Sequence, residues 1–185
     1  DGGVVDYGAG IELAYYCWTD LEVHGWIEHA GHRIAATGRG WMEHQWGSVE
    51  AWDYRWKYVS GQVDGNREFL AFSFWEGQAP SANLTRSWCA LIAPDGTLTQ
   101  FRDEDVEIVH QGDWRGYPLQ TAIRVPSVGL DLRVEPTFDD QRVPGSPFSA
   151  KLKPFWEGVS VVTGSWDGSE VAGWAISELA GWEPS

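Results

Sequence analysis

The stretch LDLRVEP, residues 130–136, alternates between apolar and charged side chains. This period of two predicts an extended strand with one buried face and one solvated face. The stretch RWKYV, residues 55–59, has the same period, with Trp56 and Tyr58 on one face and two cations on the other. EFLAFSFW, residues 68–75, is apolar on both faces, which predicts a strand that is covered on both sides or that faces a lined cavity.

Turn sequences with glycine separate these stretches and predict mostly antiparallel neighbours. They are EHAGH, VDGN, PDG and WDG, at residues 28–32, 63–66, 94–96 and 166–168. No long window keeps a helical stripe, and two glycines interrupt VAGWAISELAGW, residues 171–182, which we interpret as the closing strand. The prediction is an all-β, antiparallel, up-and-down β-barrel of about 8–10 strands, because closure leaves no exposed edges. Such a barrel can hold one small ligand.

Size and charge limit the class of the protein. A chain of 185 residues predicts a single domain over residues 1–185. The net charge of −14 opposes the phosphate neutralisation and the attraction to anionic surfaces that nucleic-acid and membrane partners need, so we expect neither partner. Thirteen tryptophans indicate an aromatic interior or an aromatic pocket, since each brings a large apolar surface.

Several kinds of reactive site lack a matching pattern. Cys17 and Cys89 allow one disulfide or two free thiols, and they do not have the spacing of a metal site. The five histidines match no known ligand spacing, so we expect them at the surface or in turns. The sequence has no nucleophile motif and no glycine-rich phosphate loop, and we expect no metal and no nucleotide cofactor. The cellular compartment stays open.

The stretch GRGWMEHQWG, residues 38–47, sets a carboxylate beside an imidazole. In a strand, Trp41, Glu43 and Gln45 share one face while His44 points to the other, so adjacency does not make Glu43 and His44 an acid–base pair. If the Trp41 face is the barrel interior, desolvation favours the protonated carboxyl and suits Glu43 to donate a proton. The alternative is a structural acceptor for tryptophan N–H groups or for an arginine.

Two further features concern the ends of the barrel. Glu178 shares one face of the predicted closing strand with Trp174 and Ile176. Because the first and last strands of a closed barrel meet, we expect that Glu43 and Glu178 can approach each other. A structural role is the default for Glu178 alone. Residues 137–154 are rich in Pro, Gly and Ser and predict a long loop over one barrel mouth.

Motifs along nearly the whole chain resemble the AttH-like family of lipocalin-like proteins, which includes carotenoid and kievitone hydratases and Diels–Alderase-type cyclases. GRGWMEHQWG resembles the family signature W-x-[D/E]-x-x-W-G. The likeness continues through APDGTL (93–98), YPLQTAIRVP (117–126), DQ (140–141), FWEGVSVVTG (155–164) and GWAISELAGW (173–182). The resemblance implies a lipocalin-like β-barrel that acts without a cofactor on a hydrophobic, unsaturated small molecule.

The resemblance also implies roles for individual residues. Glu43 stands at the acidic position of the signature, usually Asp in the hydratases, and is the predicted catalytic residue. Glu157 and Glu178 match two later glutamates, and Ile176 stands where the family usually has Tyr. We expect the substrate to contact seven residues, which are Trp41, Gln45, Trp56, Tyr58, Trp174, Ile176 and Glu178. The chain matches only the second of the family's two tandem barrels, so we expect a second barrel domain or a homodimer.

Two classes of function are open. The first is a cofactor-independent enzyme of specialised metabolism that acts on a polyene, polyketide or isoprenoid in an aromatic-lined pocket. As a hydro-lyase it uses neutral Glu43 to protonate a carbon–carbon double bond. As a cyclase of the Diels–Alderase type it folds a polyene into a reactive conformer. The second class is a non-catalytic lipocalin-like carrier or binding module for a hydrophobic small molecule.

Overall fold

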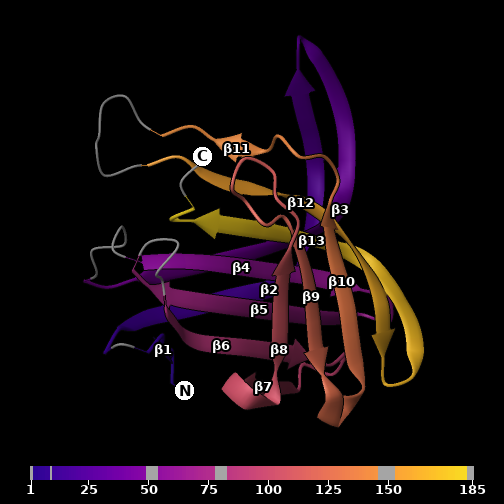
Figure 1. The fold of residues 1–185 in the computed structure, drawn as a ribbon. Coiled ribbons are helices and arrows are strands. Elements are labelled where there is room, and N and C mark those ends of the chain that lie inside the picture. The colour runs from indigo at the N-terminus through magenta and orange to yellow at the C-terminus, as the bar shows by residue number, and fades with distance from the viewer. Residues whose placement is uncertain (1, 9, 49–53, 78–82, 146–152, 183–185) are drawn as a thin grey trace. The chain divides into compact units, whose positions relative to one another are not determined.

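The computed structural model describes residues 2–8, 10–48, 54–77, 83–145 and 153–182. Its regular structure is almost entirely antiparallel β-strand (Figure 1). Helical residues form two short 3₁₀ turns, η2 (Asp103–Asp105) and η3 (Pro126–Val128). None of the helices in these ranges has the length and apolar character needed to cross a membrane. The predicted all-β antiparallel class is confirmed.

The chain divides into two compact units. Unit 1 comprises Asp1–Asp6 and Gly10–Ser48, and unit 2 comprises Tyr7–Ala9 and Val49–Ser185. The expectation of one domain over residues 1–185 stays a prediction.

Unit 1 is an antiparallel sheet with the strand order β1-β2-β3. Its strands are β1 (Val4–Asp6), β2 (Glu12–His29) and β3 (His32–Trp46). The long strands β2 and β3 form a hairpin whose turn residues, Ala30 and Gly31, have φ values of 49° and 77°. This turn lies in the EHAGH motif, as the sequence predicts. The ladder shifts register between Trp18 and Leu21, which marks a bulge in β2.

Unit 2 contains a sheet of ten strands in the order β7-β6-β5-β4-β13-β12-β10-β9-β8, with β11 paired to β12. The strands are β4 (Tyr54–Val63), β5 (Arg67–Glu76), β6 (Asn83–Ile92), β7 (Leu98–Arg102), β8 (Glu107–Gln111), β9 (Gln120–Val125), β10 (Leu130–Pro136), β11 (Arg142–Val143), β12 (Phe155–Trp166) and β13 (Ser169–Ala180). The VDGN, PDG and WDG motifs lie at the β4–β5, β6–β7 and β12–β13 turns, as predicted.

The strand order of unit 2 is that of an up-and-down barrel. Its first strand, β4, pairs with its last, β13, from Val63↔Gly173 to Trp56↔Ala180. Residues 171–182, the predicted closing strand, therefore join the end of the chain to the first strand of unit 2. Within the described residues β7 and β8 share no ladder, so the curled sheet is open between them (Figure 1).

One topological prediction is wrong. The closing strand was expected to meet the strand that carries Glu43, but β13 pairs with β4 and β12, whereas β3 pairs with β2 in the sheet of unit 1. The reason is local, because the tight turn after His29 folds β3 back along β2 and this ladder continues to Ala14↔Trp46. Glu43 and Glu178 therefore belong to different sheets.

Burial confirms two of the three quoted strands. In β10 the apolar residues are buried and the charged residues between them are exposed. In β5, buried side chains lie on both faces. For β4 the prediction of a solvated cationic face is wrong, because Arg55 and Lys57 are 9% and 1% exposed. They share the inner face with Val59 and Val63, which belong to the apolar core.

The apolar core of unit 2 fills one part of the interior. Its fully buried members include Phe69 of β5, Cys89 of β6, Ile123 of β9 and Leu132 of β10. The predicted loop, residues 137–154, contains the short strand β11, and its residues 146–152 lie outside the described residues.

Candidate functional site

Glu43 lies on β3 of unit 1, directly opposite Cys17 of β2. The hydroxyl of Tyr15 donates a hydrogen bond to Oε2 of Glu43 at 2.7 Å. Burial raises the pKa of the Cys17 thiol, a hydrogen bond with Tyr15 lowers it, and the Glu43 carboxylate raises it again. The Glu43 side chain is exposed, so the predicted enclosure among aromatic rings is not found. Its catalytic role stays a prediction.

The two faces of the hairpin separate the neighbours of Glu43. Trp41 and Gln45 share its face by strand parity, as predicted. His44 lies on the opposite face, where its ring centroid is 4.9 Å from that of Trp46. Glu43 and His44 therefore point to opposite faces of β3, as strand parity predicts.

The predicted substrate-binding residues of unit 2 lie together on the outer face of two neighbouring strands, β4 and β13. They are Trp56, Tyr58, Trp174, Ile176 and Glu178. Glu178 stands directly opposite both Tyr58 of β4 and Glu157 of β12, so a row of two carboxylates and one phenol crosses three strands.

Lys57 lies on the inner face of β4, behind this row. Its ammonium group donates hydrogen bonds to the carbonyl oxygen of Pro118 and, at 3.2 Å, to that of Gln120. Burial lowers the pKa of Lys57 to about 7. Buried Ser73 is its direct neighbour on β5, so polar side chains form a layer inside the sheet.

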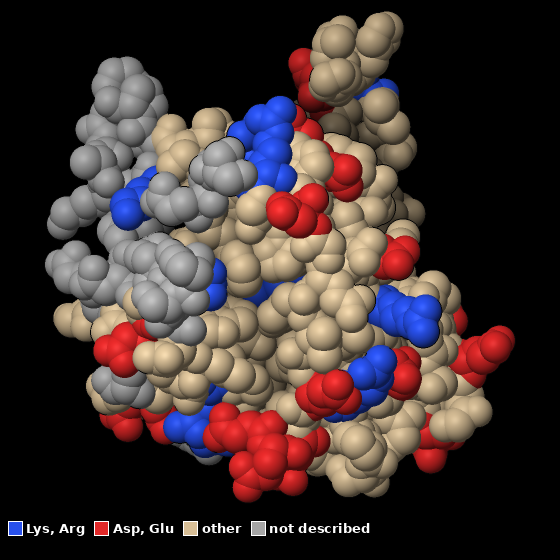
Figure 2. Space-filling view, in the orientation of Figure 1, with Lys and Arg blue, Asp and Glu red and all other residues tan. Residues whose placement is uncertain are grey.

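Arg55 lies on the same face, two residues before Lys57. Its guanidinium carbon is 4.1 Å from the ring centroid of Trp182 and 5.4 Å from that of Trp75. The two indole rings meet edge to face with centroids 5.6 Å apart. Burial lowers the pKa of Arg55, but a guanidinium stays charged at neutral pH. Figure 2 shows basic surface recessed between uncharged side chains near the centre of the drawn face.

His110 of β8 completes what we call the basic interior group, which consists of Arg55, Lys57 and His110. Its ring centroid lies 5.4 Å from that of Trp75, so β8 contacts β5. Burial, followed by the charges of Lys57 and Arg55, lowers the pKa of His110 well below its ordinary value. The imidazole is therefore neutral at pH 7.

The basic interior group was missed by the sequence analysis. His110 was expected at the surface or in a turn, and this expectation is wrong because it lies in a strand with its ring nitrogens shielded from solvent. The other four histidines are exposed. The only sequence signal is the alternation of cations with aromatic residues in residues 55–58, and alternation does not show which face lies inside.

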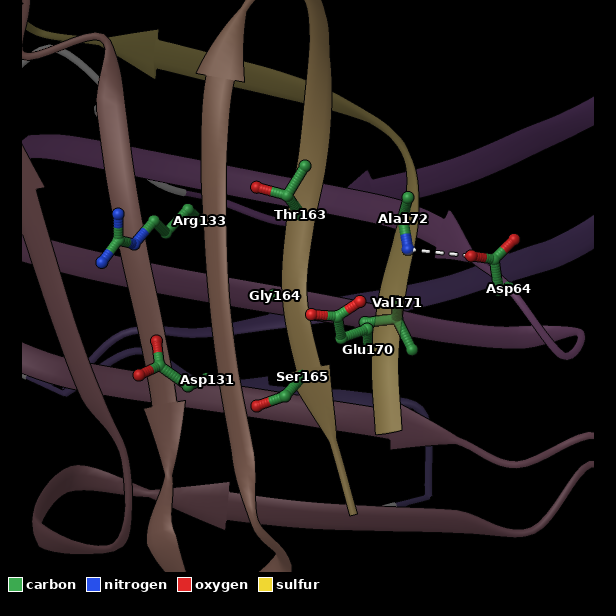
Figure 3. Close-up of a pocket in the computed structure, with 9 residues that line it drawn as sticks. All are labelled: Asp64, Asp131, Arg133, Thr163, Gly164, Ser165, Glu170, Val171 and Ala172. Atoms are coloured by element: carbon green, nitrogen blue, oxygen red, sulfur yellow. Dashed lines mark hydrogen bonds between the residues drawn. The ribbon is translucent and has the colours of Figure 1, made fainter. Parts of the chain in front are cut away.

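A separate open hollow of about 820 Å³ lies on the outer face of β10, β12 and β13 (Figure 3). The backbone N–H of Ala172 donates a hydrogen bond to Oδ2 of Asp64 at 2.9 Å on its rim. Carboxylates of Asp131 and Glu170 and the guanidinium of Arg133 also line it, and none of its nine lining residues is aromatic. It therefore differs from the aromatic-lined pocket that the sequence predicts.

Metal ligands and cysteine thiols are the other groups that could support chemistry. In the part of the chain that the structure describes, no group of three or more His, Cys, Asp and Glu side chains is arranged to hold a metal ion. Cys17 and Cys89 are both free thiols. Burial raises the pKa of Cys89 to about 12, so this thiol is not a nucleophile at neutral pH.

Comparisons with known proteins give one matching family and two similar crystal structures. A sequence profile described as AttH-like matches residues 1–182. A Nitrosomonas europaea protein provisionally assigned to AttH has a crystal structure with a TM-score of 0.80 and 25% identity, over 98% of this chain and 57% of that chain. Kievitone hydratase from Nectria haematococca gives a TM-score of 0.76 and 17% identity, over 97% of this chain and 56% of that one. The chain thus spans just over half the length of both proteins. A search of curated proteins gives no match.

Proposed function

The chain belongs to the AttH-like family of lipocalin-like proteins, and from this premise we propose that it carries the proton-donating site of a hydro-lyase. The proposed substrate is a hydrophobic, unsaturated small molecule such as a polyene, polyketide or isoprenoid, and the reaction needs no cofactor. The observation that carries the proposal is the hydrogen bond from Tyr15 to Glu43. It fixes a carboxyl group at the acidic position of the family signature.

In the proposed reaction, protonated Glu43 transfers its proton to one carbon of a carbon–carbon double bond. The neighbouring carbon becomes a cation, a water molecule adds to it, and the resulting oxonium returns a proton to the carboxylate. Trp41, on the same face, offers an indole that attracts the cation by about 0.5 to 2 kcal/mol. Tyr15 positions the carboxyl through its hydroxyl. Because Glu43 is exposed in the free protein, the bound substrate has to shield it from water before the proton is transferred.

The similarity to kievitone hydratase motivates the choice of hydration. Because the chain spans just over half of that protein, the activity is proposed for the complete protein, with a second barrel or a second copy of the chain as its partner. Gln45, on the same face as Glu43, remains part of this proposal as a substrate contact. The other expected contacts belong to unit 2 and stay predictions, namely Trp56, Tyr58, Trp174, Ile176 and Glu178.

Mass spectrometry after incubation with kievitone, or with an acyclic polyene such as lycopene, tests the reaction class. A gain of about 18 Da supports hydration. Substitution Glu43→Gln should lower the rate by about 10² to 10⁴, because it removes the proton donor but keeps the shape of the side chain. Glu28→Gln, an exposed position on β2 of the same hairpin, is the matched control and should keep the wild-type rate. Full activity in Glu43→Gln would contradict the proposal.

The exposure of Glu43 favours a second candidate, a non-catalytic carrier of a hydrophobic small molecule. The same measurement separates the candidates, since a carrier releases its ligand with unchanged mass. An isomeric product that forms equally well in Glu43→Gln identifies a cyclase of the Diels–Alderase type.

A further inference from the structure

The basic interior group of unit 2 has an unbalanced charge. Arg55 and Lys57 are buried cations, and within the described residues neither forms an ion pair with a carboxylate. Lys57 uses backbone carbonyls as its partners, and the guanidinium of Arg55 lies over the rings of Trp75 and Trp182. A buried charge is costly unless it is paired, so an anion that enters this region gains a favourable interaction.

Polar atoms beside these cations also lack partners. Nε of Arg55, both ring nitrogens of His110 and Oγ1 of Thr121 are shielded from solvent and form no hydrogen bond in the described structure. His110 and Thr121 are direct neighbours in the β8–β9 ladder. Buried polar atoms in folded proteins almost always have a hydrogen-bond partner. Three side chains from two regions of the sheet therefore share the same need for a polar ligand.

The walls of this region are aromatic. Trp75 and Trp182 flank the guanidinium of Arg55, and the ring of His110 rests against Trp75. Trp75, Trp182 and His110 are only partly buried, so part of this aromatic wall reaches the surface. Trp182 also packs against a second apolar cluster that includes fully buried Trp156. A ligand with an apolar body thus finds indole surface beside the polar atoms.

We propose that the inner face of unit 2, at Arg55 and His110, is a binding site for a small carboxylate with an apolar body. The planar guanidinium of Arg55 matches the geometry of a carboxylate. The neutral imidazole of His110 donates one N–H to the ligand, and the hydroxyl of Thr121 supplies a second donor. The apolar body lies against Trp75 and Trp182. The residues of this site belong to unit 2, whereas Glu43 belongs to unit 1, and the proposal does not depend on the proposed hydration.

The probes for the test are decanoate, decan-1-ol and decyltrimethylammonium, which share one chain length and differ in the charge of the head group. Isothermal titration of the wild-type chain should give decanoate binding at least tenfold tighter than decan-1-ol, and no binding of the cation. Equal affinity for decanoate and decan-1-ol, or no saturable binding of decanoate, overturns the proposal. This comparison needs no variant.

Variants then locate the site. Arg55→Gln should weaken decanoate binding at least tenfold and leave decan-1-ol unchanged, because only the anion loses its charged partner. The matched control is Arg67→Gln, since Arg67 also lies over an indole, 5.2 Å from the ring centroid of Trp166, and should keep wild-type affinity. If Arg55→Gln fails to fold, His110→Leu provides a second test of the site. This substitution should also weaken decanoate binding. Wild-type affinity in folded Arg55→Gln or His110→Leu overturns the assignment.

The outcome is distinguishable from a failure of the proposed function. Glu43→Gln should bind decanoate as the wild type does, because Glu43 belongs to unit 1. If the protein does not prefer decanoate, the proposed hydration is not contradicted. If no hydration is found, the proposed carboxylate site is not contradicted. A decanoate affinity that falls in Glu43→Gln but not in Arg55→Gln contradicts the placement of the site in unit 2.

Discussion

The ammonium nitrogen of Lys57 lies 3.2 Å from the carbonyl oxygen of Gln120, so one side chain of β4 holds the first residue of β9. The two strands are not neighbours in the sheet. A second hydrogen bond from the same nitrogen to Pro118 fixes the segment just before β9. Lys57 therefore connects two distant parts of the curled sheet by hydrogen bonds on its inner face.

Loss of the two hydrogen bonds from Lys57 should destabilise the protein. Above pH 10.5, where Lys57 is neutral in both the folded and the unfolded chain, we expect Lys57→Met to lower the free energy of unfolding by about 2 kcal/mol, because two buried carbonyl groups lose their donor while the packing of the stem is kept. Urea unfolding followed by far-UV circular dichroism measures the change. Lys153→Met, at the other described lysine, should change the stability by less than about 0.5 kcal/mol. Equal effects of the two substitutions would show that the hydrogen bonds from Lys57 do not contribute to the stability.

The stability should also rise with pH between about 7 and 10. The pKa of Lys57 is lowered from 10.5 to about 7, so in this interval the unfolded chain binds more protons than the folded chain. The free energy of unfolding therefore increases with pH, by up to ~1.4 kcal/mol per pH unit. Below pH 7 Lys57 is protonated in both states, so the cost of burying its charge no longer changes with pH. The difference between wild type and Lys57→Met, measured from pH 7 to 9, should show this slope, and a flat difference contradicts it.

The sequence predicts the fold of unit 2 well because the relevant signals are local. Glycine turns and the alternation in residues 130–136 specify antiparallel neighbours without knowledge of distant contacts. The position of β3 was less predictable. Whether a strand joins the sheet of the closing strand depends on long-range pairing, and the pattern of residues 38–47 is the same in either sheet.

The side chains at the two candidate sites also differ in how far the sequence predicts their positions. Strand parity alone predicts that Glu43 and His44 part to opposite faces, and the hairpin confirms it. The burial of Lys57 and His110 was not predictable, because basic side chains are placed inside only where distant carbonyls or indoles meet them. The carbonyl oxygens lie 61 and 63 residues from Lys57 in sequence, and such partners leave no local pattern.

Acid stability should depend on His110. Because its pKa is lowered in the folded protein, the unfolded chain takes up a proton first as the pH falls below about 6.5, and stability is lost. We expect His110→Gln to lose less stability than the wild type between pH 7 and pH 5, as measured by thermal unfolding. The control is His24→Gln, since His24 is exposed and lies 2.8 Å from Glu22 at the surface. An identical acid dependence of wild type and His110→Gln contradicts the prediction.

The closing ladder of unit 2 should be sensitive at Gly173. A Cβ atom there would lie 2.0 Å from the carbonyl oxygen of Gln62 and 2.7 Å from Cα of Val63, both backbone atoms of β4. We therefore expect Gly173→Ala to lower the free energy of unfolding by about 3 kcal/mol or more. Gly25→Ala is the matched strand control, because a Cβ at Gly25 meets nothing within 4 Å. Similar stability of the two variants would show that β13 and β4 do not approach this closely.

Tyr15 should act as a positioning residue for the proposed hydration. Its hydroxyl lies 2.7 Å from Oε2 of Glu43, so Tyr15→Phe leaves the carboxyl in place but free to rotate. We expect kcat to fall about tenfold with KM unchanged, since a misplaced donor slows proton transfer without weakening substrate binding.

The control for this variant lies one residue further along β2. Tyr16 points to the opposite face, where its ring centroid is 6.0 Å from that of Trp46, so Tyr16→Phe should keep the wild-type kcat. In the Glu43→Gln background, Tyr15→Phe should have no further effect, because the two residues act as one unit. Independent, additive losses from Tyr15→Phe and Glu43→Gln would mean that the hydrogen bond between them does not position the proton donor.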